Sequence, residues 1–178
     1  MNIWENAVIT AQGLALQAKL LEGSTLKLTR AATGTGYVTP GLLQQQTAVS
    51  NEAQSLEFSS MVYPEPDKCA VTMRLTNSGL EKGYTALQVG VYVEDQNGNE
   101  ILYFIAQANS EAGTIIPSES EMPGYSAEWT FYFQFGQADG VEVTVNPANT
   151  VSWEEMERYF SEELVPMTAE EIDAIFNS

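Results

Sequence analysis

Apolar and polar residues follow a helical spacing at the start of the chain. In residues 9–23 the apolar positions recur as they would on one side of an α-helix. Thr10 can cap the N-terminus of this helix, and Gly23 can adopt the left-handed conformation beyond its end. The stripe that we expect to face a core consists of Ala11, Leu14, Ala18 and Leu21.

Beyond Gly23 the spacing changes to the period of two that is typical of β-strands. The strands predicted from this spacing are residues 24–34, 54–63 and 68–77. The first of them places three residues on one side: Leu26, Leu28 and Arg30. Glycines and a proline in residues 33–46 predict a loop with one helical turn, and two prolines predict a turn at residues 64–67.

The clearest alternation lies at residues 127–136 and predicts a strand with one aromatic face. Its two faces consist of Trp129, Phe131, Phe133 and Phe135 on one side and of Glu128, Thr130, Tyr132 and Gln134 on the other. A buried sheet face is the favoured interpretation of the aromatics, and a carbohydrate-binding face is the alternative. Residues 141–147 also alternate, and we expect them to pair with this strand across the turn at residues 137–140.

A β-hairpin is predicted at residues 84–109, because Asn97-Gly98 favours a two-residue type I′ turn. That turn would place six residues on one face: Val89, Val91, Val93, Leu102, Phe104 and Ala106. The opposite face would carry Gln88, Tyr92, Tyr103 and Gln107. Here Val93 is expected opposite Leu102.

The oxygen-rich tip of this hairpin also invites comparison with a calcium-binding loop. Counting from Asp95 as the first position of an EF-hand loop, Asn97 and Asn99 fit the template. However, Glu100 stands where the template requires glycine, and Ala106 stands where it requires a bidentate glutamate. We therefore predict a turn and no metal site.

The last residues have a different character. Ser152 with Glu155 and Thr168 with Glu171 form capping boxes, which predict two short helices separated by Pro166. The apolar stripe of the first helix consists of Trp153, Met156, Tyr159, Phe160 and Leu164, and that of the second consists of Ile172, Ile175 and Phe176.

The predicted fold class is α+β: an N-terminal helix packed on a mainly antiparallel β-sheet or sandwich, with a short acidic helical C-terminal tail. The expected domains are residues 1–151 and residues 152–178.

Composition narrows the possible functions. The 178 residues carry a net charge of −17 with only seven lysines and arginines, which argues against binding nucleic-acid phosphates or an anionic membrane. No histidine is present, so Ser-His-Asp and Cys-His catalysis and imidazole metal ligation are excluded. The single cysteine, Cys69, excludes an internal disulfide and fits a buried strand position.

We predict no enzyme and no cofactor, with a carboxylate-based hydrolase as the remaining catalytic alternative. We expect no secretory signal at the N-terminus and no membrane-spanning segment.

Three motifs, taken in order, resemble the N-terminal, baseplate-attachment region of phage tail-fibre (tail-collar fibre) proteins. The first motif comprises Ile9, Thr10, Gly13, Leu16, Ala32, Gly34 and Gly36. The second is a hairpin with Val89, Gly90, Val91, Tyr92, Glu94, Asp95, Gly98 and Ile101. The third comprises residues 105–108, followed by Val141, Val143, Val145 and Pro147. Residues 83–95 and 123–129 are also similar to segments of tail-fibre-like proteins from prophages of Gram-positive gut bacteria.

The resemblance implies a virion structural protein that attaches to the baseplate, made in the host cytoplasm and located in the virion tail. It implies other tail proteins as partners, a homotrimer as the assembly and no catalytic residues. No shaft repeats follow the attachment-like region, so we expect an adaptor rather than a receptor-binding fibre. The tail helices are expected to pack either on the chain's own sheet or on a partner. The residues expected to contact a partner are Trp153, Met156, Tyr159, Phe160, Ile172 and Phe176. The alternative is a glycan-binding module that uses Tyr125 and Trp129.

Overall fold

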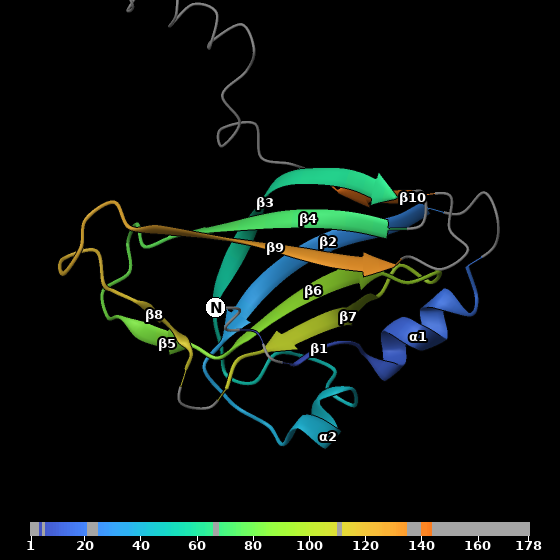
Figure 1. Ribbon diagram of the computed structural model, residues 1–178, viewed down its shortest axis with the longest axis horizontal. Helices are drawn as coiled ribbons and strands as arrows, with labels where there is room; N and C mark the ends of the chain where they lie inside the picture. Colours follow the sequence, from blue (N-terminus) through green and yellow to red (C-terminus); the bar gives the residue numbers. More distant parts are fainter. Residues whose placement is uncertain are drawn as a thin grey trace, which may run out of the picture. The chain divides into compact units, whose positions relative to one another are not determined.

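The described part of the chain is mostly antiparallel β-sheet with two short helices (Figure 1). The computed structural model describes residues 4, 6–20, 25–65, 68–109, 112–134 and 140–143. The helices are α1 (Ala11–Gln17) and α2 (Pro40–Leu43). The strands are β1 (Asn6–Ile9), β2 (Thr25–Gly34), β3 (Glu52–Glu65), β4 (Lys68–Thr76), β5 (Tyr84–Ala86), β6 (Gln88–Glu94), β7 (Glu100–Gln107), β8 (Thr114–Ile116), β9 (Ser126–Gln134) and β10 (Gly140–Val143).

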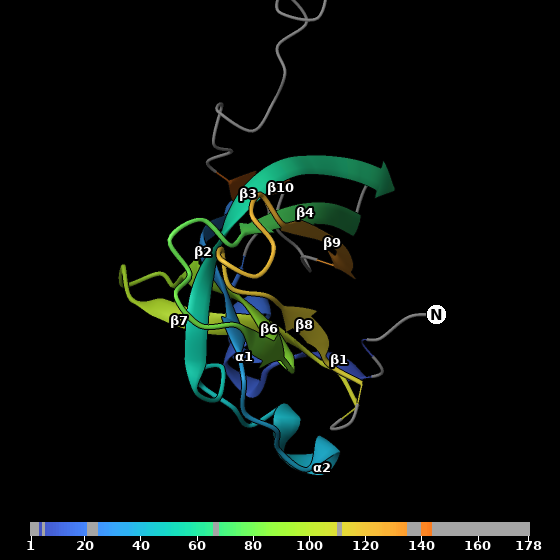
Figure 2. The same ribbon diagram turned by 90° about the vertical axis from the view of Figure 1, so that its left-hand side faces the viewer.

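The main sheet has the strand order β1-β7-β6-β2-β3-β4-β9, with every neighbouring pair antiparallel. Strand β3 connects the two parts of this sheet. Its residues 52–56 pair with β2, and its residues 57–65 pair with β4. The sheet therefore curls, and β3 carries it around the bend (Figure 2). We call β1, β7, β6 and β2 the β6–β7 half, and β4, β9 and residues 57–65 of β3 the β4–β9 half.

The partner of β10 differs from the prediction. Residues 140–143 pair in parallel with Thr25–Leu28 of β2 and not with β9. The reason lies in the bend of β3, which pairs with β2 only from Ala31 onward and leaves the first part of β2 for another strand. Residues 144–147, the remainder of this predicted strand, lie outside the described residues.

The curl encloses a core to which both halves contribute. Phe104 of β7 and Phe131 of β9 lie with ring centroids 5.3 Å apart, although their strands stand near opposite ends of the strand order. The buried residues of this core include Leu26, Leu28, Phe58, Val71, Met73, Leu75, Val89, Val91, Tyr103 and Phe104. On β9 the predicted faces are confirmed where side chains are described, with Phe131 buried and Glu128, Thr130 and Tyr132 exposed.

The β6–β7 half is covered on its second face as well. Residues 35–51, which include α2, fold over this face, and a second buried cluster forms beneath them. Its members are Ala32, Leu43, Val49, Tyr92, Leu102 and Ile105. Every residue of β6 from Gln88 to Val93 is consequently buried. Alternation along β6 therefore separates two buried faces rather than a buried face from solvent.

Helix α1 is shorter than predicted and presents a different side to the sheet. Thr10 caps it as expected, since its side chain accepts a hydrogen bond from the Gly13 amide at 3.0 Å. Gly13, Leu16 and the following Leu20 are buried, whereas Leu14 is 44% exposed, so the predicted stripe was wrong. Gly13 determines this orientation, because a Cβ there would lie 2.5 Å from the carbonyl oxygen of Tyr103. Only a residue without a side chain lets the helix approach β7 so closely.

The predicted hairpin is present as β6 and β7, but its turn and part of its register differ. Val89 lies opposite Ala106 and Val91 opposite Phe104, as expected. Beyond this point a bulge inserts Tyr103, so that Tyr92 rather than Val93 lies opposite Leu102. The bulge moves Leu102 into the second cluster and Tyr103 into the main core. Strand β8 was not predicted; it pairs with β5 in a separate two-stranded sheet.

Candidate functional site

The tip of the hairpin is a hydrogen-bonded turn built around Asp95. Its Oδ1 accepts hydrogen bonds from the amides of Asn97 and Asn99, each at 2.8 Å, and the Gly98 amide donates to the Asp95 carbonyl at 3.0 Å. Gly98 alone among the residues of this turn has a positive φ, of 80°, so the turn is not type I′. The hydrogen bonds from Asn99 and Asn97 lower the pKa of Asp95. This carboxylate is thus a structural acceptor that stays ionised near neutral pH.

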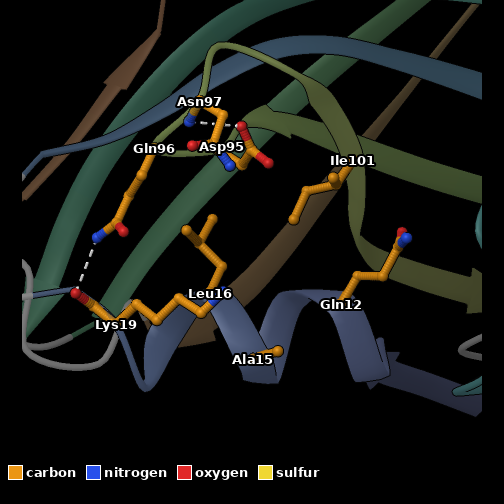
Figure 3. Close-up of a pocket in the computed structure, with 8 residues that line it drawn as sticks. All are labelled: Gln12, Ala15, Leu16, Lys19, Asp95, Gln96, Asn97 and Ile101. Carbon is orange, nitrogen blue, oxygen red and sulfur yellow. Dashed lines mark hydrogen bonds between the residues drawn. The ribbon is translucent and has the colours of Figure 1, made fainter.

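A small pocket lies between this turn and α1 (Figure 3). Its volume is about 210 Å³, and eight residues line it: Gln12, Ala15, Leu16, Lys19, Asp95, Gln96, Asn97 and Ile101. Leu16 from α1 and Ile101 from β7 point toward each other and form its apolar part. The side-chain amide of Gln96 donates to the Lys19 carbonyl at 2.9 Å and ties the turn to the end of the helix.

The chemistry of this pocket favours packing rather than catalysis. Its volume is below the ~300–1,000 Å³ of typical small-molecule sites, so it matches a single side chain or a very small solute. Asp95 and Lys19 are its only titratable residues. A general base near neutral pH needs a pKa close to 7, whereas the pKa of Asp95 is lowered. Among the described residues, no group of three Cys, Asp or Glu side chains could hold a metal ion.

A charged cluster on the second face of the β6–β7 half joins side chains from four neighbouring strands, β7, β6, β2 and β3. Arg30 of β2 contacts Glu52 of β3 at 2.6 Å and Glu100 of β7 at 3.1 Å, and its guanidinium lies 4.0 Å from the ring centroid of Tyr92. Partial burial opposes the charge on Arg30, but its hydrogen bonds to both glutamates outweigh burial and raise its pKa. A bulge after Leu28 places Arg30 here, on the face opposite Leu28, so the prediction that they share one side was wrong.

A network of buried amides holds the covering segment on the β6–β7 half. Gln88 and Gln107 are fully buried, and the Gln88 amide donates to Gln107 Oε1 at 2.7 Å and to Gln46 Oε1 at 2.9 Å. Gln107 also exchanges two hydrogen bonds with the backbone of Val38, and the Ser50 amide donates to Gln88 Oε1 at 2.7 Å. Sequence reasoning placed both glutamines on a polar face. The signal that it missed is their position in strands that are otherwise apolar.

The aromatic residues of the glycan-binding alternative serve the core instead. Trp129 is partly buried and meets Trp4 edge to face, with ring centroids 5.6 Å apart. Tyr125 is also partly buried against the core, and its hydroxyl points to the Ile115 carbonyl at 3.4 Å. The glycan-binding alternative stays a prediction.

The outer face of the β4–β9 half brings together residues from three strands. Three rows of residues cross it: Val62, Ala70 and Tyr132; Ser60, Thr72 and Thr130; Glu57, Arg74 and Glu128. In the first row Val62 is 57% and Tyr132 66% exposed. In the second, the hydroxyls of Thr72 and Thr130 lie 2.8 Å apart. This face combines large exposed apolar groups with regular polar ladders, as protein–protein interfaces do.

The six tail residues predicted to contact a partner lie outside the described residues: Trp153, Met156, Tyr159, Phe160, Ile172 and Phe176. Neither α1 nor α2, the helices of the described part, has the length and apolar character that a bilayer span requires. In comparisons with known proteins, no family model, no curated protein and no solved structure matches the chain.

Proposed function

We propose that this protein is a non-enzymatic structural component of a phage, prophage or phage-like particle, and that it acts as a tail-fibre-like adaptor at the baseplate. The proposal starts from the resemblance of its motifs to tail-fibre attachment regions. It is supported by the way these motifs, which are far apart in the sequence, meet in the fold. The described residues of these motifs belong to or adjoin strands and a helix that pack around the β6–β7 half; Val145 and Pro147 lie outside the described residues.

The first and second motifs are in direct contact. The hydroxyl of Thr10 donates to the Leu102 carbonyl, and the Thr10 amide donates to the Tyr103 carbonyl at 2.9 Å. Gly13 of the first motif packs against Tyr103, as described above. The motif residues thus specify how α1 docks on the central hairpin, which is a structural role.

Several glycines of these motifs are required by close packing. A Cβ at Gly34 would lie 2.6 Å from the Ser50 carbonyl oxygen, and one at Gly36 would lie 2.4 Å from the Ser50 Cβ. At Gly90 it would meet Val49 at 2.6 Å and Leu102 at 2.8 Å. The motif therefore encodes the covering of the sheet by residues 35–51. This agrees with an attachment domain whose function depends on shape and not on a reactive group.

The C-terminal tail remains our proposed contact with a neighbouring tail protein or subunit. The two short amphipathic helices that the sequence predicts there would need a surface to pack on, because isolated helices of this length are marginal in water. Deletion of residues 152–178 should leave the β-sheet folded and weaken self-association or docking to tail particles. Circular dichroism and light scattering on the truncated protein test this directly. A sheet that melts on truncation would instead assign the tail to the domain itself.

Particle composition tests the proposed function. Tailed particles induced from the bacterium that carries the gene, and purified by density gradient, should contain the protein in a fixed ratio to the other tail proteins. Antibody labelling in electron microscopy should place it at the baseplate end. A matched gene deletion gives the control particles. Absence of the protein from intact, purified particles would refute the proposal.

A further inference from the structure

Strand β9 is a long, regular edge strand. Among the described strands it pairs only with β4, and the register runs without a shift through all nine residues from Ser126 to Gln134. The exposed edge of a strand offers unpaired amide and carbonyl groups to another strand. In β9 these groups are carried by a segment without proline or lysine and with one charged residue, Glu128.

Two other exposed strands of the same sheet, β1 and β3, have features that discourage pairing and that β9 lacks. Strand β1, at the opposite end of the strand order, has only four residues. Strand β3, beyond its contact with β2, has two register shifts, includes Pro64 and ends in a Glu65–Lys68 ion pair. Bulges, prolines, charges and short length are the devices by which edge strands avoid pairing with other chains. Strand β9 has almost none of them.

We propose that β9 pairs antiparallel with β9 of a second copy of this chain, so that the two β4–β9 halves form one continuous sheet. The symmetry axis passes through Thr130, the central residue of the strand. This inference does not depend on the proposed phage function. It concerns only how two copies of the chain associate.

The sequence of β9 is complementary to itself in this register. Centring on Thr130 pairs all nine residues and places Glu128 opposite Tyr132 of the second copy, which avoids a glutamate pair. It also places Trp129 opposite Phe131, an aromatic cross-strand pair. A register centred on Glu128 would oppose two carboxylates and pair fewer residues. The twofold arrangement is isologous and closed, so it produces a dimer and not a fibre.

The exposed aromatic side chains of β9 also favour a second copy of this chain as the partner. Tyr132 is 66% exposed, and Trp129 remains partly exposed although it packs on Trp4. Tyrosine and tryptophan are the residue types that most often dominate binding energy at interfaces. Pairing with a second copy would cover both, while the outer-face ladder of Thr72 and Thr130 would continue across the axis.

Disulfide trapping tests the register. In Thr130→Cys the two introduced thiols would face each other across the axis, and mild oxidation should give a covalent dimer in high yield. The native thiol should not contribute, because Cys69 is fully buried and its burial raises the thiol pKa to about 11. The matched control is Thr85→Cys, an exposed position on β5, which should remain monomeric. Equal cross-linking of both variants, or none in Thr130→Cys, would overturn the proposal.

Two lysine substitutions test the same register without cysteine. Thr130→Lys would oppose two lysines at the axis and should shift the dimer toward monomer by at least tenfold in Kd. Tyr132→Lys would instead place a lysine opposite Glu128 of the second copy and should weaken association less. Sedimentation equilibrium measures both, with circular dichroism as the check of folding. A wild-type chain that is monomeric at high concentration, or equal effects of the two lysines, would contradict the proposal.

Discussion

The two halves of the curled sheet are built from similar strands but are covered differently. At β6 both faces are buried, one by the main core and the other by residues 35–51, although the charged cluster around Arg30 stays partly exposed on the neighbouring strands. In the β4–β9 half one face is buried and the other presents residues such as Val62 and Tyr132 to solvent. The difference teaches that similar strands can be covered on both faces in one part of a sheet and open to solvent on one face in another.

The largest expected difference in the free energy of unfolding comes from truncating a buried apolar side chain in one half and an exposed one in the other. Leu102 is fully buried in the second cluster, and Leu102→Ala should lower the free energy of unfolding by about 2–5 kcal/mol through the cavity that it leaves. Tyr132→Ala in the other half should change it by less than about 0.5 kcal/mol in the monomer, as exposed substitutions usually do. Urea unfolding at low protein concentration measures both. Similar losses would mean that the β4–β9 half is also covered within the subunit.

Disrupting the buried amide network should cause the next largest loss of stability. Gln107→Leu removes the partners of the Val38 backbone and of Gln88 while these groups stay buried, which should cost about 1–3 kcal/mol. Gln45→Leu, at an exposed position of the same covering segment, is the control and should be close to neutral. Thermal unfolding compares the two variants. If Gln107→Leu is as stable as the control, the network does not hold the covering segment in place.

Local patterns predicted the elements better than they predicted their partners. The period-two segments gave β2, β3, β4 and β9, and the hairpin and its first two cross-strand pairs were found from turn chemistry. The bulge at Tyr103 and the pairing of β10 with β2 were missed, because both depend on contacts between distant segments. The role of Gln88 and Gln107 was missed for the same reason, since nothing local shows that residues 35–51 fold over them.

The candidate sites were predictable only in part. The turn interpretation of Asp95 followed from Glu100 and Ala106, which break the calcium template, and the structure supplies the hydrogen bonds that the turn makes. The pocket beside α1 was not foreseen, because the helix rotates to place Gly13 on the sheet. The outer face of β9 was predicted correctly at Glu128, Thr130 and Tyr132. Its position at the edge of the sheet is a property of the whole strand order.

The hairpin tip should show a smaller, local effect. Gly98 has a φ of 80°, and Gly98→Ala should cost about 1–2 kcal/mol because a Cβ strains the left-handed conformation. Gly41→Ala in α2 is the matched control, since a Cβ there meets nothing within 4 Å and its φ is not positive. It should be neutral or slightly stabilising. Equal losses in denaturant titrations would show that strain at the tip is not the cause.

Alkaline pH should also lower stability, and the direction of this effect follows from burial. Burial raises the pKa of Cys69 to about 11 and raises the pKa values of Tyr84, Tyr92 and Tyr103. An acid whose pKa is higher in the folded state ionises first in the unfolded chain, so stability is full below the unfolded pKa and declines above it. The urea midpoint should therefore fall as pH rises from 8 toward 11. Cys69→Ala should show a shallower fall, and a midpoint that rises would contradict this account.

Hydrogen exchange measured at two protein concentrations is the most direct test of the comparison between the halves. It asks whether β6 is protected within one subunit while β9 is protected by pairing with a second copy. Amides of β6 should exchange slowly and at the same rate in dilute and concentrated protein, because both faces are closed within one subunit. Amides of β9 should exchange markedly more slowly at the higher concentration, because a second copy then pairs with the exposed edge. Exchange in β9 that is independent of concentration would contradict the account, as would an equal response in β6.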